Sequence, residues 1–144
     1  MNIVWAGLFR GEAHTPAGRA LPPGAITDLD LSAVAPHDGA VHALWAISKE
    51  AEDRPSLGSI AMLVHPDGTS EAFGGAGFGG WVGQMTCVAS FEALAFRENG
   101  AYSIEIRPSL MPEPRRGAPP SIEPSGERRL AILPLVVTGV RTNF

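Results

Sequence analysis

The strongest constraint on the fold is a strict alternation of apolar and polar residues late in the chain. In the stretch NGAYSIEIRP (99–108), Tyr102, Ile104 and Ile106 occupy every second position, and polar residues fill the positions between them. Successive side chains of a β-strand leave opposite faces, so this pattern predicts a strand that buries one face and exposes the other. A chain built from such strands is expected to be all-β.

The same period of two recurs in earlier and later segments. It runs through 40–48 and 58–65, the second of which is partly apolar on both faces. The longer apolar run 128–139 contains Pro134, which has no N–H to donate to a neighbouring strand. We therefore expect an edge strand or a bulge there.

Turn signals lie between these runs, while the charged segment 48–54 is interpreted as a loop. Three pairs suit tight hairpins: Asp38-Gly39, Asp67-Gly68 and Asn99-Gly100. The last is expected to join a strand over 87–96 to the strand that follows it. A short helix over 90–98 is the alternative, because its apolar residues also fit helical spacing.

Length and composition indicate one soluble domain over residues 1–144. The chain is 44% hydrophobic, which is enough for a sizeable core, and only 18% charged. The charged fraction is below the usual ~25%, which favours contacts with a protein partner or self-association.

A net charge of −4 without a clustered basic face argues against nucleic acid as a partner. With no basic leader and no apolar run near ~20 residues, we expect no membrane contact and a cytoplasmic location.

A proline-rich segment, 108–126, is expected to be a long loop between two strands. Its six prolines favour extended backbone with exposed donors and acceptors. It is interpreted either as a plain surface excursion or as an arm that binds a partner.

A glycine-rich stretch, FGGAGFGGWVG (73–83), contains the spacing G-x-G-x-x-G at Gly75, Gly77 and Gly80. A dinucleotide site needs a strand before this motif and a helix after it, and the flanking sequence predicts no such unit. We therefore expect the glycines to permit a bulge or close packing among three aromatic residues, and we predict no cofactor. If those rings are exposed, the stretch becomes an interface.

Catalytic and metal-binding motifs are lacking in the sequence. His37, His42 and His65, with Asp38, could form a metal site only if the fold gathers them, and they are interpreted as surface residues. Cys87 lies in the apolar context MTCVAS and is expected to be a buried, inert thiol. We predict that the protein is not an enzyme.

The alternating strand before Asp67-Gly68, the stretch NGAYSIEI (99–106) and the closing LPLVV (133–137) together resemble a bacterial family of small uncharacterised proteins. The resemblance covers residues 40–138. It implies an immunoglobulin-like β-sandwich and supplies no catalytic or binding residue. This chain has Asn-Gly where that family tends to have Pro-Gly.

These observations predict a single-domain, immunoglobulin-like antiparallel β-sandwich of seven to nine strands. Its expected core residues are Trp5, Trp45, Ile60, Met62, Tyr102, Ile104, Ile106 and Ile132. The leading hypothesis for function is a non-catalytic protein–protein interaction module, a subunit or accessory component of a larger bacterial or phage assembly. The candidate interface residues are Phe73, Phe78, Trp81, Met111, Arg115 and Arg116. The alternatives are a sandwich that binds a small ligand or carbohydrate, and a metal-dependent hydrolase.

Overall fold

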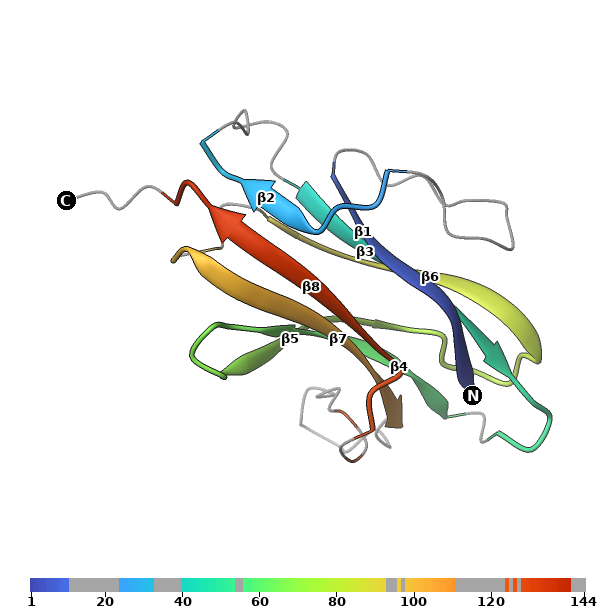
Figure 1. Ribbon diagram of the computed structural model, residues 1–144. Coiled ribbons are helices and arrows are strands. Elements are labelled where there is room, and N and C mark those ends of the chain that lie inside the picture. The colour runs from blue at the N-terminus through green and yellow to red at the C-terminus, as the bar shows by residue number, and fades with distance from the viewer. Residues whose placement is uncertain are drawn as a thin grey trace, which may run out of the picture.

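The protein is an all-β sandwich of two sheets, as the alternation predicted (Figure 1). The computed structural model describes residues 1–10, 24–32, 40–53, 56–92, 96, 98–110, 124, 126 and 128–140. The three-stranded sheet has the order β1 (Asn2–Arg10), β3 (Ala40–Lys49), β6 (Gly83–Glu92). The five-stranded sheet has the order β2 (Asp28–Asp30), β8 (Ala131–Thr138), β7 (Gly100–Leu110), β4 (Leu57–Val64), β5 (Ser70–Ala76). These eight strands lie within the expected number, and the described residues contain no helix.

Neighbouring strands are antiparallel, except that β2 runs parallel to β8. The Asp67-Gly68 hairpin is confirmed, because it joins the paired strands β4 and β5. Gly68 has a φ of +90°, the left-handed conformation that glycine adopts without a steric penalty. Asp38-Gly39 lies outside the described residues.

The predicted hairpin at Asn99-Gly100 is wrong. β6 pairs with β3, whereas β7 pairs with β4 and β8, so the chain crosses from one sheet to the other here. The side-chain oxygen of Asn99 accepts a hydrogen bond from the backbone N–H of Val140 at 2.9 Å, which ties the crossing to the end of β8. The Tyr102 hydroxyl donates to the carbonyl of Glu98 at 2.9 Å and fixes the same corner.

The alternative prediction of a short helix over 90–98 is also wrong for the part of that segment that the structure describes. Residues 90–92 continue β6, and they pair with residues 40–42 of β3. Residues 93–95 and 97 lie outside the described residues. Pairing to β3 satisfies the backbone groups that a helix would have had to satisfy internally.

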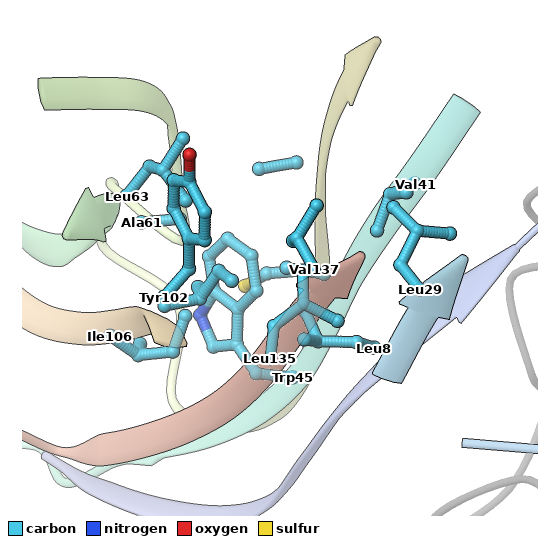
Figure 2. Close-up of a cluster of buried hydrophobic side chains, with 14 of the residues drawn as sticks. Leu8, Leu29, Val41, Trp45, Ala61, Leu63, Tyr102, Ile106, Leu135 and Val137 are labelled. Carbon is cyan, nitrogen blue, oxygen red and sulfur yellow. The ribbon is translucent and has the colours of Figure 1, made fainter. Parts of the chain in front are cut away.

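The main core lies between the sheets and is centred on Trp45 (Figure 2). Trp45 is fully buried, and its Nε1 donates to Ser59 Oγ at 2.8 Å. Ser59 Oγ in turn donates to the carbonyl of Ala76 at 3.0 Å, so this buried polar group is satisfied. The predicted positions of Tyr102 and Ile104 in this core are confirmed, as is that of Ile106.

Three of the expected core residues are buried elsewhere. Trp5 packs with Leu44 and Ala46 in a separate cluster. Since these two β3 residues alternate with Trp45, that cluster lies on the outer face of the three-stranded sheet. Ile60 and Met62 are buried but alternate with Ala61 and Leu63, the β4 residues that belong to the core between the sheets.

Ile132 was expected in the core and is 53% exposed. In β8 the apolar run continues on both faces, and Leu135 and Val137 take the buried one. The alternation alone could not tell which face was inward, because both were apolar.

The prediction of an edge strand or a bulge at Pro134 holds only locally, because β8 lies between β2 and β7 and pairs with β7 without a shift. β2 pairs with β8 only from Val136 to Thr138, where the Val136 N–H donates to Thr27 at 3.0 Å. Backbone groups two residues apart in a strand point to the same side. The missing N–H of Pro134 therefore faces the side on which no described strand pairs with residues 131–135.

Candidate partner-binding end of the sandwich

The strand register brings three chain connections to one end of the sandwich. Lys49 at the end of β3 pairs with Gly83 at the start of β6. Leu57 at the start of β4 pairs with Leu110 at the end of β7. The β3–β4 turn, the β5–β6 connection (77–82) and the end of β7 at Leu110 therefore lie at the same end (Figure 1, lower part of the picture). We call this the Trp81 end.

Lys49 ties this end together from within. Its side chain is only 3% exposed, and its Nζ donates to the carbonyl oxygens of Leu57 and Gly79, each at 2.7 Å. The same ammonium lies 5.0 Å from the centre of the Trp81 ring, within range of a cation–π interaction. One cation thus joins the end of β3, the start of β4 and the β5–β6 connection.

Glycines permit close approaches at this end, but the three aromatic rings do not pack on one another as the sequence predicted: Phe78 packs on Gly58, and Phe73 on Phe91. The Phe78 ring lies so near Gly58 that a Cβ on that residue would come within 2.5 Å of it. Gly77 has a φ of +83°, and a Cβ there would be 2.6 Å from Ile47. The Trp81 Nε1 donates to the Gly77 carbonyl at 2.8 Å, which fixes the indole over this turn.

The predicted bulge is present in β5. Ala61 pairs with Gly74 and Met62 with Ala72, so Phe73 is the extra residue between them. Its ring meets the Phe91 ring edge-on at 4.8 Å. The motif G-x-G-x-x-G leads into β6, not into the helix that a dinucleotide site requires.

The exposed apolar residues of this end are not the aromatic ones. Phe78 and Trp81 are half-buried, whereas Val82 is 65% exposed and Leu110 is 36% exposed. Phe73 is also half-buried, but its ring contacts Phe91 near the opposite end of β6, so the structure does not bring it together with Trp81. Sequence reasoning missed Val82, since nothing in the pattern told which residue of the stretch would project outward. Three other candidates, Met111, Arg115 and Arg116, lie outside the described residues. The proline-rich segment begins later than expected, because β7 extends to Leu110.

An ion pair borders the Trp81 end. The Met1 ammonium donates to Asp53 Oδ1 at 3.0 Å, and the Glu50 N–H donates to Asp53 Oδ2 at 2.8 Å. The Glu50 N–H, followed by the ammonium, lowers the pKa of the Asp53 carboxyl. These hydrogen bonds favour the ionised carboxylate, which links the N-terminus to the beginning of the β3–β4 turn.

The two described histidines are engaged separately. His42 lies in β3 and is buried, so its predicted surface position is wrong, whereas His65 follows directly after β4. The Nδ1 of His42 lies 2.6 Å from Ser90 Oγ, and the Nε2 of His65 lies 3.3 Å from Glu71 Oε1. His37 and Asp38 lie outside the described residues. Within the described ranges, no three histidine, cysteine or acidic side chains gather as a metal site would need.

Cys87 lies in the core between the sheets and is 3% exposed. Burial raises the pKa of this thiol from its ordinary value of 9.0 to about 11. At pH 8 only about one thiol in a thousand is then a thiolate, which is the reactive form. The thiol is buried, as the sequence predicted.

We expect a thiol reagent such as Ellman's to react with Cys87 slowly in the native protein and rapidly in urea. Since the folded pKa is raised, the folded state keeps a proton that the unfolded state loses. The contribution of the protonated Cys87 thiol to the free energy of unfolding is therefore complete below pH 9.0, and it is lost as the pH rises to about 11. Rapid native labelling at pH 8, or stability that does not fall over this pH range in wild type relative to Cys87→Ala, would contradict this account.

Comparison with protein-family models, with curated proteins and with solved structures found no match to this chain. In its described residues, no helix is long and apolar enough to cross a membrane.

Proposed function

We propose that this protein is an immunoglobulin-like, non-catalytic protein–protein interaction module that serves as a subunit or accessory component of a larger bacterial or phage assembly. One observation carries the proposal. The register of the strands brings the β5–β6 connection and the end of β7, from which the proline-rich segment continues, to the same end of the sandwich.

Strand order supports the immunoglobulin-like part of the proposal. β1, β3 and β6 match the A, B and E strands of that fold, and β8, β7, β4 and β5 match G, F, C and C′. Tyr102 lies near the start of β7 and bonds to the backbone four residues earlier, like the tyrosine corner of strand F. In variable domains the loops after strands B and F bind the antigen, and here they correspond to the loops of the Trp81 end.

The rigidity of the Trp81 end also favours a binding role. Lys49 fixes Gly79 and Trp81 from the inside, so the exposed Val82 is presented on an ordered turn. A preorganised loop loses less conformational entropy when a partner binds.

The test is capture of partners from the native host with the tagged protein, followed by mass spectrometry. A stoichiometric partner should be retained by wild type and lost with Val82→Asp, because a carboxylate would be buried without a counter-charge. The matched control is Ile132→Asp, which changes another exposed apolar residue on the outer face of the five-stranded sheet. Capture that is unchanged by Val82→Asp, or equally weakened by the control, would refute a partner site at the Trp81 end.

The alternative of a carbohydrate-binding sandwich relied on the aromatic rings as a platform. The Trp81 ring has Lys49 near it and its Nε1 occupied, and Phe78 packs on Gly58. These contacts hold both rings against the protein, which leaves less of each ring for a stacked sugar than a fully exposed platform would offer.

A further inference from the structure

Most edges of the two sheets carry a feature that discourages pairing with another strand. β2 is three residues long and carries Asp28 and Asp30, and β5 is bulged at Phe73. Pro134 removes a donor from the part of β8 that β2 leaves uncovered. Short strands, charges, bulges and proline are the usual ways in which proteins protect sheet edges.

The three-stranded sheet is protected at one edge only. β1 has a register shift between Ile3 and Trp5, and its Leu8 carbonyl accepts a hydrogen bond from Ile26 at 2.7 Å. β6 pairs with β3 over all ten of its residues without a shift. No described strand pairs with the other edge of β6.

β6 lacks each of these protective features. From Gly83 to Phe91 it contains no charged residue and no proline, and its first charge is Glu92. Residues that favour strands, such as Thr86 and Val88, lie within it, and Val88 is 44% exposed. Among the strands that the structure describes, β6 is therefore the edge best suited to accept another strand.

We propose that two copies of this chain associate by antiparallel pairing of their β6 strands, around a two-fold axis at Val88. The pairing would join the two three-stranded sheets into one sheet of six. Both copies use the same surface in such a two-fold interface, so association stops at the dimer and does not continue into a filament.

The sequence of β6 is self-complementary about this axis. On the outer face Val88 meets Val88 of the second copy, and Thr86 lies opposite Ser90. Gln84 lies opposite Glu92, where its amide can donate a hydrogen bond to the carboxylate. An apolar pair thus occupies the centre, hydroxyl and amide–carboxylate pairs flank it, and no like charges are opposed.

Sedimentation equilibrium of the full chain over micromolar to millimolar concentrations tests the proposal. Wild type should form a dimer, and Val88→Lys or Val88→Glu should each weaken it by more than about tenfold, since like charges then meet at the axis. An equimolar mixture of the two variants should recover the dimer. Ile132→Lys, at an exposed position outside β6, should leave dimerisation unchanged.

A second measurement does not depend on the variants. Amide hydrogen exchange in wild-type β6 should slow as the protein concentration rises, while exchange at β5 stays constant. Wild type that remains monomeric to millimolar concentration overturns the proposal. So does a Val88→Lys variant that dimerises as well as wild type, or a mixture of the charged variants that fails to associate.

Discussion

Replacing Trp45 with alanine is expected to lower the free energy of unfolding by about 3–5 kcal/mol. The side chain is fully buried between the two sheets, so its removal leaves a cavity that both sheets line (Figure 2). The change also removes the Nε1–H group that donates a hydrogen bond to Ser59 Oγ at 2.8 Å. Against a typical total of about 5–15 kcal/mol, the loss is a large share of the stability. Urea denaturation followed by circular dichroism measures it.

Two further variants separate the sources of that loss. Trp45→Phe keeps most of the volume but loses the hydrogen bond to Ser59, and we expect it to cost about 1–3 kcal/mol. Trp81→Ala removes a half-buried ring and should cost less than Trp45→Ala. A loss below about 1 kcal/mol for Trp45→Ala would mean that the core is not centred on this residue.

The sequence predicted the fold best where one face of a strand was apolar and the other polar. Tyr102 and Ile106 were assigned to the core on that basis, and the structure confirms them. The prediction that Ile132 lies in the core was wrong because its strand is apolar on both faces. Alternation then does not indicate which face points into the core. The predicted hairpin at Asn99-Gly100 was wrong because a turn signal indicates only that the chain reverses. It does not indicate which sheet the next strand joins.

The candidate site was less predictable, because its residues come together only through the strand register. The glycine-rich stretch and the proline-rich segment were separate features of the sequence. The pairing of Lys49 with Gly83 places the start of β6 at the same end of the sandwich at which Leu57 pairs with Leu110, the last residue of β7. Lys49 was interpreted as part of a charged loop, yet it is the last residue of β3 and is buried. Its partners are backbone carbonyl oxygens, which every residue has, and so no sequence pattern marks them.

Replacing Lys49 with methionine is expected to cost about 2–4 kcal/mol, because the carbonyl oxygens of Leu57 and Gly79 both lose their donor. Methionine keeps the length and the apolar part of the side chain, so the loss reports mainly the ammonium group. The effect should also be local, since the contact with Trp81 is lost at the same time. Urea denaturation gives the cost, and amide hydrogen exchange gives its location.

We expect exchange in the Lys49→Met variant to rise most at 77–82 and to change little in the centre of β7. The control is Glu50→Gln, which alters the next, exposed residue and should change stability by less than about 0.5 kcal/mol.

If Lys49 orders the Trp81 end for binding, Lys49→Met should weaken partner capture, although the Lys49 side chain is buried and would not contact the partner. Val82→Asp should weaken capture with little change in stability, so the two variants together separate the ordering of the loop from direct contact. Unchanged exchange at 77–82 in Lys49→Met would show that the β5–β6 connection is held by its glycines and Trp81 alone.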